Sequence, residues 1–546
     1  MKRVFAAAAT AATLLSPASA QERVDLDAVT RIRQEGFRRS KVMDLASELM
    51  DGIGPRVTGS PNMKAANEWA RAKFESWGLV NAHLESWGPF GRGWTWEGCS
   101  VRMLSPDTTQ FIAIPQAWTP GTNGPIRAKA VRVNVAAASD LDKFHGKLAG
   151  AAVLFGEWKA PRVEDKPLSQ RYDEKGLGEI AAYAIPGVGP ARFNREEYQK
   201  RRELAKVARK FFADEKVAAV LSEGSHDGGT LGVQEGGSQK TGEPEGVPWV
   251  VLTAEHFGRL SRLLEREVPV ELEIDVRARF LNGDPTAWNT VAEIPGTEKK
   301  GEVVMLGAHL DSWQGGTGAT DNGAGSVAAM EAVRILETLG LKPRRTIRIA
   351  LWSGEEQGLL GSRAYVAEHF GSFPYTPEEL EKPSFLRKPS GPLSIKPEHA
   401  KLAGYFNLDN GTGKVRGIYV EENAAVVPVF EAWMAPLKDL GVTTVTMNDT
   451  SGTDHVSFDT VGLPGFQFIQ DEIEYESRTH HTNMDVYERL QKADLMQASI
   501  VMAVFVWQAA NRDAQLPRKP LPRWEPEKKE KAGEETPAKP SGGGAR

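Results

Sequence analysis

The chain has 546 residues, of which 40% are hydrophobic and 25% are charged, and its formal net charge at pH 7 is -5. This length exceeds what one hydrophobic core usually serves, so we expect more than one domain. A weakly acidic chain lacks the basic surface that nucleic-acid binding requires, which argues against a nucleic-acid partner.

The first 20 residues have the organisation of a secretory signal peptide. Lys2 and Arg3 precede a short apolar run, and Ala18-Ser19-Ala20 forms a cleavage site of the A-x-A type. The apolar run is too short to span a bilayer and no longer one follows, so no membrane anchor is expected. The signal peptide indicates a protein that is secreted or periplasmic, and because Cys99 is the single cysteine, we expect no internal disulfide.

Further along the chain, the residue pattern divides the protein into four segments. Residues 21–115 are expected to contain a helix from Ser60-Pro61 to Trp77 and a strand from Val80 to Trp87. From 116 to 282, short β-rich runs punctuated by Gly and Pro predict a separate β-rich domain. Residues 283–512 carry longer apolar strands and helices, and the polar tail 513–546 is expected to be disordered.

Three apolar runs within 283–512 predict buried parallel strands, and each leads directly into polar residues. These runs are Val303 to Ala308 before His309, Thr346 to Trp352 before Glu355 and Glu356, and Leu402 to Leu408 before Asp409. Ligands of open α/β sheets bind outside the carboxyl ends of the strands, so these polar groups are expected to converge. Asp321 precedes an apolar helix expected from Val327 to Leu339.

The polar residues have the composition of a two-zinc hydrolase site with its own general base. The potential metal ligands are His309, Asp321, Glu356, Asp409 and His481, and the additional acid is Glu355. Each fragment alone has a simpler interpretation, namely a packed histidine, a solvated Glu-Glu pair or an Asp-Asn-Gly turn. Their coincidence at strand ends in one compact segment favours the metal site.

The ordered motifs GAHLDSW, GATDNGAGS, WSGEEQGLLGS, NLDN, SGTDHVSF and HHTNMD resemble the two-zinc exopeptidase family of secreted aminopeptidases and glutamate carboxypeptidases, metallopeptidase family twenty-eight. The resemblance covers roughly residues 283–512 and implies the zinc exopeptidase fold, an α/β fold with a mixed, mostly parallel sheet flanked by helices. Residues 21–115 resemble the N-terminal part of the same peptidase domain. Residues 116–282 resemble the protease-associated domain often inserted in this family, either as a lid or as a passive insert.

The resemblance also implies a role for each site residue and a cofactor of two Zn²⁺ per chain. Asp321 would bridge both ions, His309 and Asp409 would complete one site, and Glu356 and His481 the other. Three further residues would take part in catalysis: Glu355 as the general base, Asp311 as the partner that orients the His309 imidazole, and His480. The bond after Asp311 is expected to be a cis peptide.

His480 is a departure from the family pattern, because many members have Tyr directly before the last histidine ligand. A histidine there could still donate a hydrogen bond to the oxyanion of the tetrahedral intermediate. The His-His form is more similar to the carboxypeptidase Q and dipeptidase branch, which leaves the direction of attack open. Asp454-His455 resembles a family motif that lines the site without binding metal, although a capping Asp beside a packed His explains it equally well.

The resemblance therefore implies a secreted zinc-dependent exopeptidase that hydrolyses terminal bonds of peptide substrates through a hydroxide bridging two zinc ions. An aminopeptidase is the first expectation, and a carboxypeptidase or dipeptidase of the same family is the alternative. An alternative of another class is a catalytically inactive peptidase fold that serves as a binding module. Such a module would be free to lose Glu355 or a metal ligand, and this chain retains all of them.

Overall fold

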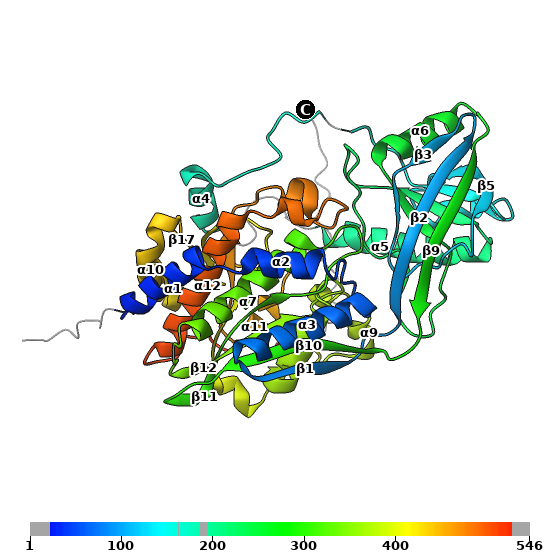
Figure 1. The fold of residues 1–546 in the computed structure, drawn as a ribbon. Coiled ribbons are helices and arrows are strands. Elements are labelled where there is room, and N and C mark those ends of the chain that lie inside the picture. Colours follow the sequence, from blue (N-terminus) through cyan, green and yellow to red (C-terminus); the bar gives the residue numbers. More distant parts are fainter. Residues whose placement is uncertain (1–21, 162, 186–193, 527–546) are drawn as a thin grey trace, which may run out of the picture.

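The computed structural model describes residues 22–526 except 162 and 186–193, so the predicted signal peptide lies outside the described residues. The described residues form two eight-stranded sheets. Figure 1 shows them in two bodies, with β2, β5 and β9 in the body at the upper right. We call the body that contains residues 93–281 the inserted domain, and the body built from the flanking segments the large domain.

The sheet of the large domain has the strand order β1-β10-β12-β11-β15-β18-β16-β17. Its strands are β1 (Val80–Pro89), β10 (Thr286–Ile294), β11 (Lys299–His309), β12 (Arg345–Trp352), β15 (Leu402–Asn407), β16 (Val415–Tyr419), β17 (Thr444–Thr446) and β18 (Gly465–Gln470). The central strands β12, β11, β15 and β18 run parallel, whereas β1, β10 and β16 add antiparallel pairs. The expected mixed, mostly parallel sheet is therefore confirmed.

Helices cover both faces of this sheet. They are α1 (Leu26–Arg38), α2 (Val42–Met50), α3 (Pro61–Trp77), α7 (Ala324–Thr338), α8 (Leu360–His369), α9 (Pro377–Leu380), α10 (Val427–Met434), α11 (His455–Asp459) and α12 (Lys492–Asn511), and a short pair β13 (Gly371–Ser372) and β14 (Ser394–Ile395) follows α8. The helices predicted before Trp77 and after Asp321 match α3 and α7. Ser60 caps α3 by accepting a hydrogen bond from the Met63 amide, as its Ser-Pro start predicts.

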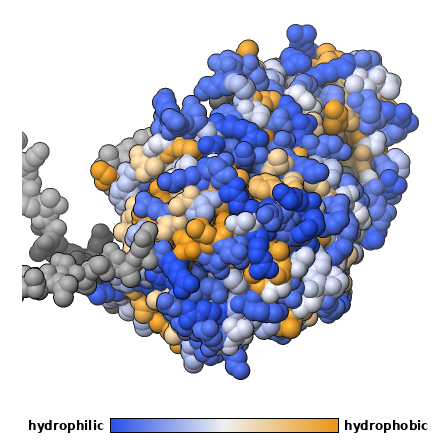
Figure 2. Space-filling model, turned by 60° about the vertical axis from the view of Figure 1, so that its left-hand side comes forward, coloured by the Kyte–Doolittle hydropathy of each residue, from blue (hydrophilic) through white to orange (hydrophobic). Residues whose placement is uncertain are grey.

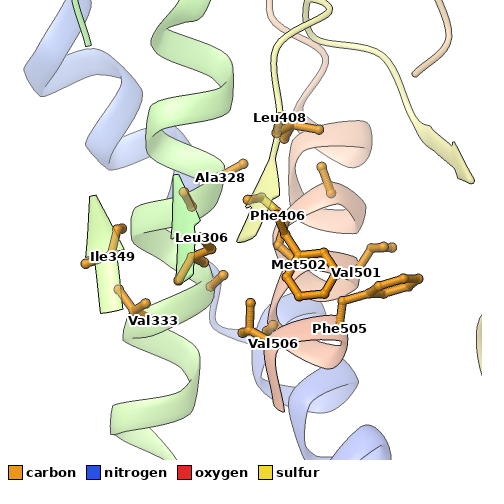
Figure 3. Close-up of a cluster of buried hydrophobic side chains, with 14 of the residues drawn as sticks. Leu306, Ala328, Val333, Ile349, Phe406, Leu408, Val501, Met502, Phe505 and Val506 are labelled. Carbon is orange, nitrogen blue, oxygen red and sulfur yellow. The ribbon is translucent and has the colours of Figure 1, made fainter. Parts of the chain in front are cut away.

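The core explains why the central strands are continuously apolar. Leu306 of β11 lies in a cluster with residues of α7 and α12, whereas its neighbour Met305 lies in the cluster on the opposite face of the sheet. Figure 3 shows Leu306 and Phe406 packing between Val333 of α7 and Phe505 of α12. Because both faces of each central strand are buried, both sets of alternating residues must be apolar.

The inserted domain contains the second sheet, in the order β3-β2-β9-β5-β6-β7-β8-β4. Its elements are β2 (Gly93–Ser105), β3 (Thr109–Phe111), β4 (Ala113–Pro115), β5 (Ile126–Val133), β6 (Ala152–Phe155), α4 (Glu174–Ala181), α5 (Arg195–Asp214), β7 (Ala219–Glu223), β8 (Trp249–Leu252), α6 (Ala254–Glu265) and β9 (Glu271–Leu281). The predicted start at 116 is therefore too late. β2 pairs along its length with β9, a partner too distant in sequence to be recognised from local pattern.

One part of the inserted segment leaves its own sheet and lies on the large domain. We call residues 164–185 the strap. Figure 1 shows its helix α4 well away from the second sheet, and α4 contacts β17 of the large domain. Arg171 of the strap lies 3.1 Å from Asp471 Oδ2 and 2.7 Å from Asp494 Oδ2, and both acids are buried. Gln170 forms an antiparallel bridge with Ile473.

The predicted disorder of the tail is wrong for residues 513–526. Leu516 is buried against the large core, and Arg518 donates hydrogen bonds to the carbonyls of His399 and Leu402. A single apolar residue and one arginine anchor a segment whose average composition is polar. The remaining tail, 527–546, lies outside the described residues.

α12 corrects the expectation that no long apolar segment follows the N-terminus. Among the described helices, this one alone is long and apolar enough to cross a membrane, with a mean hydropathy of 1.4. However, 89% of its apolar window is buried, and it packs against α7 and α1. On the face shown in Figure 2, hydrophobic residues occur in small groups among hydrophilic ones. The composition of α12 is thus explained by its central place in the core.

We expect Phe505→Ala to destabilise the fold, because this ring contacts the rings of Phe406, Phe430, Trp433 and Phe468. Replacing such a buried aromatic by alanine costs about 3–5 kcal/mol of unfolding free energy. Leu380→Ala, at a side chain that is 52% exposed, is the matched control and should stay within about 0.5 kcal/mol of wild type. Urea unfolding measures both variants, and equal effects would contradict the assigned core.

Candidate metal centre

The site lies where three neighbouring parallel strands end. His309 is the last residue of β11, Glu355 and Glu356 follow β12, and Asp409 follows β15. These strands are adjacent in the order β12-β11-β15, so their carboxyl ends meet at one edge of the sheet. The structure therefore brings together the groups that the strand pattern predicted to converge.

Asp321 lies between two histidines that come from distant parts of the chain. Its Oδ1 is 3.2 Å from His309 Nε2, and its Oδ2 is 3.1 Å from His481 Nε2. Asp409 Oδ1 lies 3.4 Å from His309 Nε2, and Glu356 Oε2 lies 3.0 Å from His481 Nε2. The five residues thus form two halves that share one carboxylate, as a bridging ligand requires.

The donor atoms fit a pair of divalent cations. His309, Asp321 and Asp409 form one group whose ligand atoms lie within 4.8 Å of one another. Glu356 Oε1 and Asp409 Oδ1 are buried without any hydrogen-bond donor among the described residues. Buried carboxylates are normally paired or bind metal, and imidazole with carboxylate is the ligand set that zinc prefers.

The electrostatics of the cluster point to the same conclusion. Burial opposes protonation of His309, but the carboxylates of Asp409 and Glu355 outweigh it and raise the pKa of the imidazole well above its usual value. Burial likewise opposes protonation of His481, whereas Glu356 and Asp321 raise its pKa well above the usual value. These directions show how strongly the carboxylates attract positive charge.

An irregular turn holds Asp321 in place. Asp485 is buried behind it and accepts hydrogen bonds from the Thr320 amide at 2.5 Å and the Asp321 amide at 3.2 Å. Gly318 has φ +61, and a Cβ there would lie 2.3 Å from the Cβ of Ser312, so no larger residue fits. The cis peptide bond at this site is Asp321-Asn322, which corrects the expectation that it follows Asp311; the other one among the described residues is Ser105-Pro106.

Arg56 holds the loop between His309 and Asp321. Its buried guanidinium donates hydrogen bonds to the carbonyls of Leu310 at 2.6 Å, Thr317 at 2.7 Å and Gly318 at 2.8 Å. Burial lowers the pKa of this arginine to about 10, with the nearby carboxylates of Asp485 and Asp311 opposing the shift. The group therefore keeps its charge at neutral pH and adds a fixed cation behind the acidic cluster.

Asp311 supports the site in two ways. Its backbone carbonyl lies 3.0 Å from His309 Nδ1, whereas its nearer carboxylate oxygen is 3.5 Å away. The carboxylate accepts hydrogen bonds from the Thr58 hydroxyl at 2.9 Å and from the amides of Glu355 at 3.3 Å and Glu356 at 3.4 Å. The side chain thus orients mainly the loop that carries the two glutamates, and the carbonyl is the closer partner of the imidazole.

Glu355 has the surroundings of a proton acceptor beside the metal ligands. Its Oε2 lies 4.0 Å from His309 Nε2, and the side chain is almost fully buried. Burial is the largest cause that raises its pKa well above the usual value, and Asp409 and Asp454 add to it, while His309 opposes the shift. An acid whose proton affinity is raised in this way suits general acid-base catalysis.

His480 lies at the rim of the cluster. Its ring centroid is 3.9 Å from that of His481, and its Nε2 is 3.8 Å from Asp321 Oδ2. Burial and the neighbouring His481 lower the pKa of His480, which favours the neutral imidazole. With Asp321 and His481 it also satisfies the spacing of a metal-binding group, so it is a candidate ligand as well as a hydrogen-bond donor.

Asp454 and His455 are both buried, and the histidine is fully packed. His455 Nε2 lies 3.4 Å from Glu421 Oε1, away from the metal ligands named above. Asp454 lies close enough to raise the pKa of Glu355. The two residues thus differ: the histidine fills the core and the aspartate borders the site.

Two residues that adjoin the candidate metal ligands were not predicted from the sequence to lie at the site. Tyr475 is buried and its ring centroid lies 4.8 Å from that of His480. Gln234 of the inserted domain has its amide nitrogen 2.8 Å from His481 Nδ1. A tyrosine that reaches the site from five residues before His480 shows no ligand-like spacing, and nothing in the sequence around Gln234 indicates a contact with the large domain.

Asp454 provides a pH-dependent test of the site. Burial is the main cause that raises its pKa to about 7. An acid whose folded pKa exceeds its unfolded value of about 3.9 keeps its proton in the folded state, so stability falls as pH rises from about 4 through about 7. We expect Asp454→Asn to relieve this loss, by about 1–4 kcal/mol at pH 8, in protein treated with a chelator.

Urea unfolding at pH 5 and pH 8 measures the effect. Asp214→Asn, at a side chain that is 63% exposed and paired with a lysine, is the control and should follow wild type. If the difference in stability between Asp454→Asn and wild type were the same at both pH values, the raised pKa would be wrong.

Comparisons with known proteins agree with this geometry. Residues 289–506 match peptidase family M28. Carboxypeptidase Q of Homo sapiens is 25% identical over 493 residues, which cover 90% of each chain. Leupeptin-inactivating enzyme 1 of Streptomyces exfoliatus is 30% identical over 187 residues, 34% of this chain and 36% of that protein.

Solved structures extend the likeness to nearly the whole chain. A peptidase M28 precursor from Shewanella amazonensis SB2B has 25% identity and a TM-score of 0.63, covering 91% of this chain and 99% of its own. A zinc aminopeptidase from Bacillus subtilis shares the fold with a TM-score of 0.55 at 18% identity, over 86% of this chain and 95% of its own. The family match includes every predicted metal ligand, so the part of the chain that carries the candidate site is similar to peptidase family M28, and the comparisons support a hydrolase of the metallo-exopeptidase type.

Proposed function

We propose that this protein is an aminopeptidase with two zinc ions per chain, which removes N-terminal residues from peptide substrates. The observation that carries the proposal is the position of Asp321, whose two oxygens face the separate imidazoles of His309 and His481. A shared carboxylate between two nitrogen ligands is the arrangement that holds a pair of cations together. The zinc aminopeptidase fold of Bacillus subtilis supports the choice of metal.

The proposed ligand sets follow from the two halves of the site. His309 and Asp409 would hold one zinc, Glu356 and His481 the other, and Asp321 both. When bound, the pair of cations would supply Lewis acidity that polarises the substrate carbonyl and acidifies water.

The remaining chemistry belongs to side chains of the protein. Glu355 would take a proton from the attacking water at its carboxylate and return it to the leaving amine, because burial raises the pKa of this acid and so its affinity for a proton. His480, held neutral by burial, would donate a hydrogen bond to the oxyanion. The buried Tyr475 ring would exclude water beside it.

The acidic rim of the site supports attack at the amino end of a peptide. Glu476 is 67% exposed and its carboxylate lies 4.0 Å from His480 Nδ1. A free carboxylate at the rim would attract the α-ammonium group of a substrate. Glu472 accepts a hydrogen bond from the Tyr172 hydroxyl of the strap, so the strap would border the same region.

A carboxypeptidase or dipeptidase is the second candidate. Proteins named carboxypeptidase Q match 90% of this chain at 25–26% identity, whereas a probable leucine aminopeptidase 2 matches 22% of it at 39% identity. We therefore propose the end of the peptide that is attacked separately from the peptidase activity itself.

We also propose that the protein is exported, which rests on the signal-like sequence of residues 1–20. Residues 93–281 are proposed to be a protease-associated domain.

We expect Glu355→Gln to bind zinc as wild type does and to lose most of its turnover. The amide keeps the shape of the side chain but cannot accept a proton, and a general acid-base group contributes about 10²–10⁴ in rate. Metal analysis of both proteins should return about two zinc per chain. Glu255→Gln, at an exposed position in α6, is the control. Undiminished kcat in Glu355→Gln would remove this residue from catalysis, and an absence of zinc in wild type would reject the metal site.

A comparison of dipeptides with free and acetylated amino ends tests the direction of attack. An aminopeptidase recognises the free α-ammonium group, so we expect kcat/KM to fall by at least about 10²-fold on acetylation, because the blocked substrate lacks the positive charge that the site is built to bind. Equal rates on both substrates would favour the carboxypeptidase alternative. Amidation of the carboxyl end is the matched control and should leave the rate of an aminopeptidase nearly unchanged.

A further inference from the structure

A segment of the inserted domain runs alongside the loop that carries His481. The Val233 amide donates a hydrogen bond to the His481 carbonyl at 2.8 Å, and Gly232 forms an antiparallel bridge with Thr482. The Leu231 carbonyl accepts a hydrogen bond from the Asn483 amide at 3.1 Å. We call residues 231–234 the clasp, because they pair with residues 481–483 of this loop.

The side chain at the end of the clasp reaches the metal ligand itself. The amide nitrogen of Gln234 lies 2.8 Å from His481 Nδ1, while Nε2 of the same ring faces Asp321 and Glu356. Within the described part of the chain, Gln234 is the one hydrogen-bond partner of this Nδ1. The amide of glutamine exchanges its donor and acceptor ends by a half-turn of its last side-chain bond, and the two are alike in shape.

The chemistry of a histidine ligand determines which end is needed. An imidazole that binds a cation through Nε2 is neutral and carries its proton on Nδ1, so it requires an acceptor there. In the half-turned orientation, Gln234 Oε1 takes the place of the nitrogen and accepts that proton. The carbonyl oxygen of Asp311 has the same relation to His309 Nδ1, at 3.0 Å.

Neighbouring contacts keep the backbone of Gln234 in place. Its carbonyl accepts hydrogen bonds from the Ala117 amide at 3.1 Å and from the Gln314 side chain at 3.3 Å. Val233 is buried in the cluster that contains Trp313, and the Trp313 ring lies edge-on to His481 at 6.0 Å. The Gln234 side chain is exposed, so water competes for the hydrogen bond and its effect is expected to be moderate.

We propose that Gln234 is a positioning residue for the metal ligand His481: from the inserted domain, it accepts the Nδ1 proton and so fixes the tautomer that presents Nε2 to the cation. This inference rests on the two-zinc site proposed above. It makes the two halves of the site unequal. His309 finds its acceptor in its own loop, whereas His481 depends on a residue of the other domain.

The test is zinc retention by the full-length protein against increasing dipicolinate, followed by metal analysis. We expect Gln234→Met, which keeps the length and removes the acceptor, to lose one zinc per chain at a chelator concentration about 10–100-fold lower than wild type, while the second zinc is retained as in wild type. Gln234→Glu restores an acceptor and should retain both ions. Gln110→Met, at an exposed glutamine of β3, is the matched control and should follow wild type.

The outcomes separate this inference from the proposed function. If wild type binds two zinc and Gln234→Met releases both ions at wild-type concentrations, the positioning role is rejected and the two-zinc site stands. Weakened binding of both ions to the same degree, or loss in Gln234→Glu equal to that in Gln234→Met, would show a merely structural effect and also reject it. If wild type binds no zinc, the proposed function fails and the inference fails with it. Thermal unfolding of the chelator-treated proteins checks that all variants fold alike.

Discussion

The structure depends on the crowding of buried carboxylates at one edge of a sheet. Asp321, Glu356 and Asp409 converge there, with Glu355 and Asp454 close behind. Charges taken out of water repel one another strongly and must be balanced or neutralised. This constraint raises the pKa of three acids, Glu355, Glu356 and Asp454. The same carboxylates raise the pKa of His309 and His481. Under the proposed function, divalent cations would satisfy this constraint more completely than protons do, because each cation can contact several carboxylate oxygens at once.

Crowding like charges requires a rigid frame, and the frame is built from neutral or oppositely charged groups. The parallel strands β12, β11 and β15 fix where three of the polar groups begin. Arg56 holds the loop after β11 through backbone carbonyls and adds a buried positive charge. Backbone amides of Thr320 and Asp321 donate to Asp485, which fixes the turn of the shared ligand. Each of these contacts can be formed before any metal binds, so the site is largely pre-organised.

The sequence predicted those features that depend on local pattern. His309, Glu355 and Asp409 each follow an apolar run, and buried parallel strands place such residues at a common edge whatever the loops do. Prediction failed where a contact joins distant segments. β2 could not be assigned to the inserted domain because its partner β9 lies far along the chain, and neither Gln234 nor the strap carries a pattern that indicates its contact with the large domain. The tail after residue 512 was predicted to be disordered from its polar composition, but the buried side chain of Leu516 anchors its first part to the core.

Segments of the inserted domain contact the loop of the large domain between β18 and α12, which carries His481. The strap contacts its first part, through Gln170 with Ile473 and Arg171 with Asp471, and the clasp pairs with its last part, from His481 to Asn483. His309, in contrast, ends β11, and Asp409 follows β15, so both are positioned by strands of the large domain. Movement of the inserted domain would therefore displace the loop that carries His481. The packing of the inserted domain therefore bears on the position of His481 relative to Asp321, whose Oδ2 lies 3.1 Å from His481 Nε2.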